Sequence, residues 1–293
     1  MRNGVTTDSP HLRRSPGSNW VRPGAMVMAT TSAGESTFGA PEAVVVCLLG
    51  GFRLMKLGRP VSVRRGSKAQ ALLSNLALRP RLGIPRDELL GLVWPASQFD
   101  LAGQSLNTLV SSLTRSLGDA LAGRPPVVHD QGTYRLNAEF GVRVDVVEFD
   151  AAVDAGDRCA RAGDEAGAMA AYLGAASMYG GDLAFGSDIE HVIQRERLRA
   201  RFLSVRSRLA DIHFSSGNYG AALDNALDLL AHDACREDAH RLAMRSYVRM
   251  GERAQALRQY RICRQVLARE FDALPEPETE RLFESVRLDP SSV

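Results

Sequence analysis

The sequence predicts a mainly α-helical protein that begins with a small β-sheet region, and three observations support this fold class. Residues 44–63 alternate short apolar runs with turns that contain glycine, which is typical of strands. Residues 68–118 carry helical spacings of apolar residues, and a hairpin with a glycine turn follows them. From Asp145 onward Ala, Leu and Arg dominate, strand signals stop, and a glycine motif repeats.

Length and composition exclude several classes of protein. A chain of 293 residues suggests two domains. No run approaches the roughly 20 apolar residues of a membrane helix, and no apolar segment follows Arg13 and Arg14 as a secretory signal would require. The four cysteines lie far apart and the histidines are scattered, without zinc spacing, phosphate loop or nucleophile elbow. We expect a cytoplasmic protein without membrane contact, metal, cofactor or enzymatic activity.

Charge divides the chain into a basic front part and an acidic back part. Residues 41–144 hold 13 Lys and Arg against 7 Asp and Glu, a net charge of +6. Residues 145–293 hold 19 Arg against 25 Asp and Glu, a net charge of −6. A polyanionic partner suits the front part. We therefore predict one domain over residues 42–144 and a second over residues 145–290.

The ordered part of the chain is predicted to begin with a small sheet. Residues 1–41 are rich in Ser, Thr, Gly and Pro and lack periodicity, so we predict a disordered tail, with Met1, Met26 or Met28 as the start. An apolar run bounded by two glycines then indicates a buried strand. Three antiparallel strands are predicted at residues 44–49, 52–55 and 61–63, with residues 57–60 as a turn.

Three helices are predicted after this sheet. Ser67 is placed to cap the first helix, which continues to Leu78. Pro85 stands in the first turn of the second helix, which spans residues 86–93 and ends before a Trp-Pro pair. A nine-residue loop, residues 95–103, then leads to the third helix. Trp94 and Phe99 are expected to anchor the core or this loop rather than to stack on a ligand.

The third helix, residues 104–118, has an apolar face and a polar face. The apolar face is formed by Leu106, Leu109, Val110, Leu113 and Leu117. Short polar side chains and one cation occupy the other face, and no acidic residue occurs before Asp119. Such a face can lie against DNA, because a carboxylate there would meet phosphate; an ordinary core helix with a polar face is the alternative. The candidates for DNA contact are Gln104, Asn107, Thr108, Ser111, Ser112 and Arg115.

The three helices precede a predicted β-hairpin. Residues 127–129 and 134–136 flank a turn at residues 130–133 that contains glycine. This order predicts a winged helix-turn-helix, whose third helix enters the major groove while the hairpin, or wing, lies along the backbone. Thr133 and Arg135 are the candidate contacts on the wing, and an ion pair of Arg135 with Asp130 is the alternative. Arg64, Arg65 and Lys68, before the first helix, are either phosphate contacts or a solvated surface cluster.

A motif repeats in the back part of the chain. The segment that begins Gly217-Asn218-Tyr219 recurs 34 positions later from Gly251, and an earlier copy begins at Gly163. Glycine at the turn between two helices and small residues such as Ala222 in the second helix are typical of tetratricopeptide repeats. An insertion that includes Gly180 and Asp188 separates the first copy from the second. We predict an all-α, tetratricopeptide-like domain here.

The combination resembles the Streptomyces antibiotic regulatory protein (SARP) type, an OmpR/PhoB-type winged helix followed by a bacterial transcriptional activator domain (BTAD). The similar stretches are residues 68–73, 87–94, 132–136, 144–150, 196–209 and 253–260. The resemblance implies an activator that binds promoter repeats, usually as a dimer, and recruits RNA polymerase. Carried over by position, Asn107, Thr108, Ser111 and Arg115 would face bases or phosphates. Residues 95–103 would correspond to a loop that can touch polymerase, and a plain connector is the alternative.

One departure from this family keeps a rival hypothesis open. The recognition helices of the family usually carry several arginines, whereas this chain has Ser112 and Thr114 and keeps Arg115. Fewer cations release fewer counterions, so nonspecific DNA affinity is weaker. The rival is a tetratricopeptide scaffold whose winged helix mediates protein contacts. In either case the repeats are expected to offer a surface for a homodimer, a protein partner or an unidentified ligand.

Overall fold

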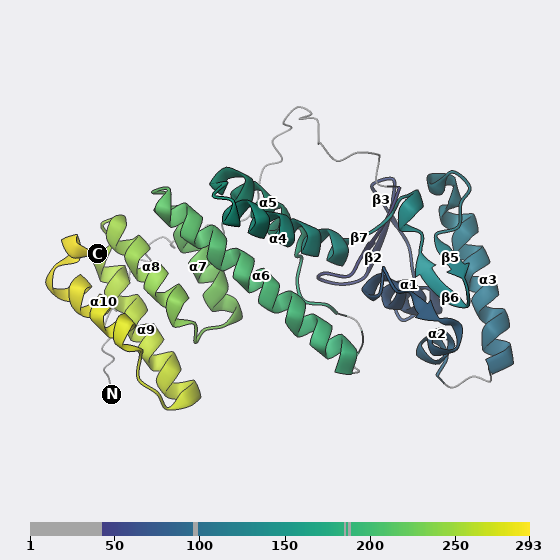
Figure 1. Cartoon of the computed structure of the whole chain (residues 1–293). Helices are drawn as coiled ribbons and strands as arrows, with labels where there is room; N and C mark the ends of the chain where they lie inside the picture. Colours follow the sequence, from purple (N-terminus) through teal and green to yellow (C-terminus); the bar gives the residue numbers. More distant parts are fainter. Residues whose placement is uncertain (1–42, 96–98, 185, 187–188) are drawn as a thin grey trace, which may run out of the picture. The chain divides into compact units, whose positions relative to one another are not determined.

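The structure is a computed structural model, which describes residues 43–95, 99–184, 186 and 189–293 (Figure 1). The predicted tail therefore lies outside the described residues, as do residues 96–98 of the predicted loop. Within the described part the predicted fold class is confirmed: a winged helix-turn-helix with small sheets precedes an all-α repeat. No helix in this part is long and apolar enough to cross a membrane.

The front sheet has four strands rather than the predicted three. They are β1 (Val44–Cys47), β2 (Arg53–Lys56), β3 (Arg59–Val61) and β7 (Val142–Val144), in the order β3-β2-β1-β7. The pairings of β1 with β2 and of β2 with β3 are antiparallel, as predicted, but β7 joins β1 in parallel. The turn is also shorter than predicted, because Leu57 and Gly58 make it alone, with φ of 49° and 73°. Pro60 is accommodated in β3 because β3 is an edge strand.

The three helices of the winged helix occur in the predicted order. They are α1 (Lys68–Leu78), α2 (Arg86–Val93) and α3 (Phe99–Leu117), followed by the short 3₁₀ helix η1 (Gly118–Leu121). The Ser67 side chain caps α1 by accepting the backbone N–H of Gln70 at 3.3 Å, as expected. The predicted loop over residues 95–103 is wrong, because residues 99–103 belong to α3. Ala102 is buried four residues before Leu106, so the apolar face of α3 extends by one turn.

The wing is a three-stranded sheet. Its strands are β4 (Ile84–Pro85), β5 (Val127–Asp130) and β6 (Thr133–Leu136), in the order β4-β6-β5. The predicted hairpin is present with a tighter turn, Gln131 and Gly132, whose φ values of 46° and 81° fit a type I′ turn. The strand β4 was not predicted. Pro85 pairs with Thr133 in β4 and precedes α2, so it does not stand in the first turn of that helix.

In the described residues, the back part consists of seven α-helices and a short 3₁₀ helix, η3 (Pro290–Ser292). The α-helices are α4 (Asp145–Arg161), α5 (Glu165–Met178), α6 (Ile189–Ser215), α7 (Tyr219–His232), α8 (Glu237–Arg249), α9 (Arg253–Phe271) and α10 (Pro277–Leu288). The three repeat glycines, Gly163, Gly217 and Gly251, precede α5, α7 and α9, with φ between 75° and 79°. Ala168, Ala222 and Ala256 are fully buried where the paired helices meet. The tetratricopeptide-like repeat is confirmed, and the predicted insertion between α5 and α6 is described only in part.

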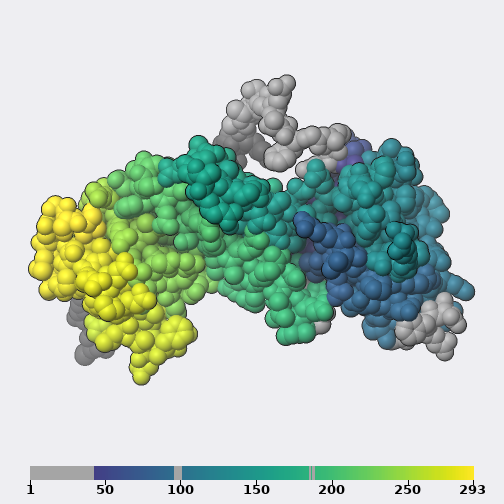
Figure 2. Space-filling view, viewed as in Figure 1, coloured from purple at the N-terminus to yellow at the C-terminus, as the bar shows by residue number. Residues whose placement is uncertain are grey.

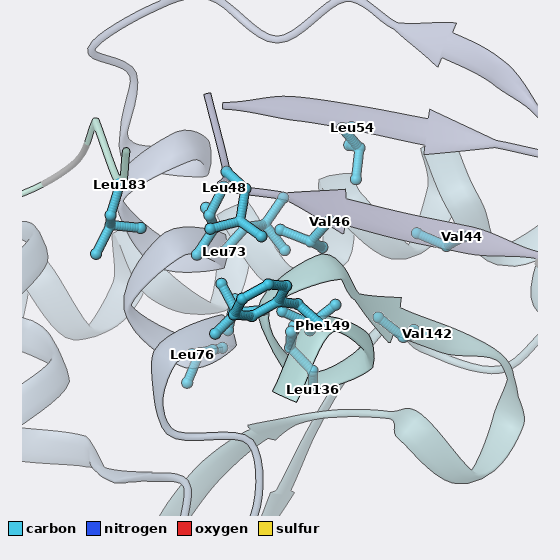
Figure 3. Packing of buried hydrophobic residues seen from close by; sticks show 14 of the residues in the cluster. Val44, Val46, Leu48, Leu54, Leu73, Leu76, Leu136, Val142, Phe149 and Leu183 are labelled. Atoms are coloured by element: carbon cyan, nitrogen blue, oxygen red, sulfur yellow. The ribbon is translucent and has the colours of Figure 1, made fainter. Parts of the chain in front are cut away.

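One hydrophobic core joins the winged helix to the first helices of the repeat. The largest cluster of buried apolar residues extends from Ala43 in front of β1 to Leu209 in α6. Phe149 of α4 is completely buried in it, beside Leu73 and Leu76 of α1 and Leu136 of β6 (Figure 3). Two smaller clusters hold the later helices together. The front sheet and α4 therefore share one interior.

Candidate DNA-binding surface

The helix α3 divides its residues between the core and the solvent. The side chains of Ala102, Leu106, Leu113 and Leu117 are buried, and Leu109 and Val110 pack against the same core. All six polar candidates are exposed on the opposite face: Gln104, Asn107, Thr108, Ser111, Ser112 and Arg115. Gln104, Thr108, Ser111 and Arg115 follow each other at spacings of four, three and four residues, so they form one stripe.

Hydrogen bonds within α3 limit what its threonines can offer to a ligand. The hydroxyl of Thr108 donates to the carbonyl of Gln104 at 3.0 Å, and that of Thr114 donates to Val110 at 2.9 Å. Thr108 therefore presents an acceptor and a methyl group, and Thr114 is half-buried. The side chains of Asn107, Ser111 and Arg115 make no hydrogen bond or ion pair among the described residues, so their donors are available.

The acidic residue just after α3 is neutralised from the front sheet. The Nζ of Lys56, on β2, lies 2.6 Å from the carboxylate of Asp119. The same ammonium donates to the carbonyl of Ser116 at 2.8 Å, near the C-terminal end of α3. The hydrogen bond from Lys56 lowers the pKa of Asp119. The negative charge of Asp119 is thus paired next to the polar face of α3.

The wing places its two candidates differently from each other. Tyr134 and Leu136 are buried, so Arg135 between them points outward, as the strand alternation predicts. The guanidinium of Arg135 pairs with Glu139 at 3.3 Å, and not with Asp130 as the alternative expected. Thr133 is half-buried beside the turn. Asp130 is exposed at the wing tip, where its carboxylate would repel phosphate.

The basic cluster before α1 separates into two environments. Arg64 and Arg65 are exposed in the loop that precedes Ser67. Lys68, in contrast, donates from Nζ to the carbonyl of Val93 at 2.7 Å, and its ammonium lies 5.9 Å from the centre of the Trp94 ring. Lys68 therefore caps the C-terminal end of α2. Trp94 packs against the core, in agreement with its predicted anchoring role, whereas the Phe99 side chain lies outside the described residues.

A residue that the sequence reasoning missed connects the wing to α3. Arg86, the first residue of α2, donates from Nη1 to the hydroxyl of Tyr134 at 2.9 Å. Its Nη2 lies only 2.8 Å from the position that a Cβ on Gly103 would take. The absence of a side chain at Gly103 lets the guanidinium lie directly against α3. The signal in the sequence was a glycine inside an otherwise helical segment, which indicates a close approach.

Comparisons with known proteins identify the back part of the chain. The family "Bacterial transcriptional activator domain" matches residues 144–287. The regulatory protein AfsR of Streptomyces griseus is 26% identical over 236 residues, 78% of this chain and 24% of that protein. AfsR of Streptomyces coelicolor is 25% identical over 247 residues, 83% of this chain and 24% of that protein. The chain thus spans about a quarter of the length of the curated relatives it matches.

A solved structure has a similar fold. Mycobacterium tuberculosis EmbR, in a complex with a low-affinity phosphopeptide, superposes with a TM-score of 0.65 at 21% identity. The match covers 85% of this chain and 67% of the EmbR chain, so it includes the winged helix as well as the repeat. Residues 144–287 therefore match the bacterial transcriptional activator domain, and the chain as a whole has the fold of EmbR, with a winged helix in front of this domain.

Proposed function

We propose that the protein is a sequence-specific DNA-binding activator and that α3 enters the major groove. The exposed face of α3 carries this proposal, because over residues 104–117 it presents amide, hydroxyl and guanidinium groups and no carboxylate. Asn and Gln can read adenine, Ser and Thr can contact several base edges, and Arg can read guanine or bind phosphate. With Arg115 as its single cation, α3 would read sequence mainly through short polar side chains.

The remaining candidates would position the winged helix on the DNA backbone. Arg64 and Arg65 are exposed and would contact phosphate, whereas Lys68 would contribute little because its ammonium already binds the carbonyl of Val93. On the wing, Arg135 would have to leave Glu139 to bind phosphate, and Thr133 would donate its hydroxyl. A surface with so few cations implies binding as a homodimer on promoter repeats, where two copies add their contacts.

Further parts of the proposal concern the activator domain and its partners. We infer that residues 42–144 bind DNA and that residues 145–290 contact RNA polymerase or a second copy of the chain, in the cytoplasm. The helical repeat also offers room for a ligand or protein partner that controls activity. The identity to AfsR supports this assignment only for the quarter of AfsR that the chain matches.

Selection of genomic DNA fragments by the purified full chain, repeated at several salt concentrations, tests the proposal. Sequence-specific enrichment with a steep fall of affinity in salt is expected. The double variant Asn107→Ala/Arg115→Ala should lower the affinity for the selected DNA sequence by at least about tenfold. It should also reduce the slope of log affinity against log salt concentration by about 1. The matched control is Gln255→Ala/Arg249→Ala, which removes the same kinds of side chain from exposed positions of the repeat.

The same experiment distinguishes the rival function. A scaffold whose winged helix binds proteins would enrich no DNA fragment and would show no salt dependence. The observation that favours this rival is the single cation on the exposed face of α3. If both double variants lose DNA affinity equally, the contact does not lie on α3 and the proposed reading mode is wrong.

A further inference from the structure

The helix α9 concentrates positive charge in a part of the chain that is acidic as a whole. Five arginines occur between Arg253 and Arg269, against one acidic residue, Glu270. Two of the five are engaged: Arg253 binds the backbone carbonyls of Val286 and Arg287, and Arg269 pairs with Glu270 at 3.6 Å.

The other three arginines have no carboxylate partner among the described residues. Arg258, Arg261 and Arg264 are exposed and follow each other at intervals of three residues, so they are neighbours on one side of α9. Like charges at this spacing destabilise a helix by a few tenths of a kcal/mol per pair. Folding alone does not account for this cluster, because it opposes the formation of α9.

Two of these arginines line a groove with an aromatic wall. The groove lies between α9 and α10 and has a volume of about 420 Å³. These two helices belong to the yellow end of the space-filling view in Figure 2. The lining of the groove is Tyr260, Arg261, Arg264, Gln265, Ala268 and Phe283. The rings of Tyr260 and Phe283 stack with centroids 3.9 Å apart, and the hydroxyl of Tyr260 donates to Glu280 at 2.6 Å. The groove therefore combines a rigid apolar surface with two available guanidinium groups.

We propose that this groove binds an acidic segment of a protein partner, with an apolar side chain against Phe283 and carboxylates on Arg261 and Arg264. Guanidinium groups bind carboxylates in bidentate geometry. The stacked rings of Tyr260 and Phe283 offer a preformed surface on which an apolar side chain of the peptide can pack. Burial and the hydrogen bond to Glu280 raise the pKa of Tyr260 to about 12, so its hydroxyl remains a neutral donor. This inference is independent of DNA binding by α3.

The surroundings of the groove favour a short peptide over nucleic acid. The neighbouring helix α10 carries three carboxylates. Glu278 pairs with Arg241 and Arg245, Glu280 accepts from Tyr260, and Glu284 pairs with Arg287. A duplex is a continuous line of phosphates, so it would meet these carboxylates as soon as it left the arginines. A peptide with two acidic residues around an apolar one needs only the space that the groove provides.

The test measures binding of a fluorescein-labelled peptide, rich in Glu and containing Leu and Phe, to the full chain by fluorescence anisotropy. The variant Arg261→Gln/Arg264→Gln should weaken this binding by at least about tenfold. Its matched control, Arg161→Gln/Arg249→Gln, removes two exposed arginines at the ends of α4 and α8 and should leave affinity within about twofold. Circular dichroism confirms that both variants are folded.

A second peptide and a DNA duplex complete the experiment. Replacement of every Glu in the peptide by Gln should reduce affinity for the wild-type chain to the level of the Arg261→Gln/Arg264→Gln variant. The proposal is overturned if the acidic peptide does not bind, or if both double variants lose affinity equally. It is also overturned if a duplex of random sequence binds more tightly than the peptide and depends on the same two arginines, since the groove would then be a second DNA contact.

Discussion

The carboxylate of Asp145 accepts the backbone N–H of Leu48 through both of its oxygens, at 2.9 and 2.8 Å. It also accepts the N–H of Leu49 at 2.9 Å. These residues lie 97 and 96 positions apart in the chain, at the end of β1 and at the start of α4. The buried carboxylate of Asp145 therefore connects the front sheet to the first helix of the repeat.

Substitution of Asp145 by Ala is predicted to destabilise the whole chain. It leaves two buried N–H groups without acceptors, and each such group costs about 1–3 kcal/mol. The free energy of unfolding should therefore fall by at least about 2 kcal/mol in chemical denaturation. The control is Asp224→Ala, which removes an exposed carboxylate from α7 and should change stability by less than about 0.5 kcal/mol. Equal stability of the two variants would show that the hydrogen bonds of Asp145 do not stabilise the fold.

Replacement of Gly103 by Ala should separate folding from DNA binding. The new methyl group would stand 2.8 Å from Nη2 of Arg86 and push this flexible guanidinium away from α3 and Tyr134. Since Ala favours a helix over Gly by about 0.5–1 kcal/mol, stability should be kept or increased. DNA affinity should fall, because the wing loses its connection to the proposed reading helix.

A glycine on the preceding helix provides the matched control for this experiment. Gly91→Ala in α2 adds a methyl group in open space, so it should stabilise the chain without changing DNA affinity. Thermal unfolding and fluorescence anisotropy on the selected DNA measure the two effects. If both glycine variants bind DNA equally well, Arg86 does not position the wing.

Acidification below the ordinary pKa of histidine is predicted to destabilise the helix pair α8 and α9 through His240. This side chain is buried, donates from Nε2 to the carbonyl of Ala234 at 2.9 Å, and accepts at Nδ1 from Gln259 at 2.8 Å. Burial lowers its pKa, so the unfolded chain takes up the proton first as the pH falls. The stabilising contribution of neutral His240 is therefore full above about pH 6.5 and is lost as the pH falls through the lower folded pKa.

The free energy of unfolding is measured in the wild type and in His240→Gln. The two pH values, 7.5 and 5.5, are chosen to span this range. The wild type should lose up to about 1.4 kcal/mol per pH unit more than the variant, the limit for one proton. Parallel pH dependences in the two proteins would show that another group carries the titration.

The repeat glycines are predicted to be needed for their backbone conformation rather than for space. Gly217 has φ of 78°, and a Cβ there would meet no atom within 4 Å. The variant Gly217→Ala should therefore lose about 1 kcal/mol through the left-handed conformation alone. Gly174→Ala, inside α5 and also in open space, should instead gain about 0.5–1 kcal/mol. Opposite signs in denaturant unfolding are expected, and equal signs would contradict the conformational explanation.

The parts of the fold that the sequence predicts are those that local chemistry determines. The glycines before α5, α7 and α9 mark turns that need positive φ, and the alanines that follow mark close helix contacts. The wing is equally local, because its hairpin closes through two adjacent residues. By contrast, β7 is three residues long and pairs with β1 across the whole winged helix, so no local pattern announces it.

The candidate site divides in the same way. The polar face of α3 follows from helical spacing, and the structure places all six of its predicted residues on that face. Two other contacts join different elements, and residue spacing does not reveal them. Lys68 donates to the carbonyl of Val93, and Arg86 donates to the hydroxyl of Tyr134. The sequence pattern predicts that Gly103 ends a loop, whereas in the structure Gly103 is a point of close packing inside α3.

The shared interior around Phe149 determines where chimeric regulators can be joined. A junction at residue 144 would cut through the largest apolar cluster and would separate Asp145 from Leu48. That cluster ends at Leu209, and the next begins at Ala210, both within α6. A junction in the turn at residues 216–218, between α6 and α7, leaves the interior around Phe149 whole and crosses only the smaller cluster that joins α6 to α7 and α8. The exchangeable module is therefore the winged helix together with the first three helices of the repeat.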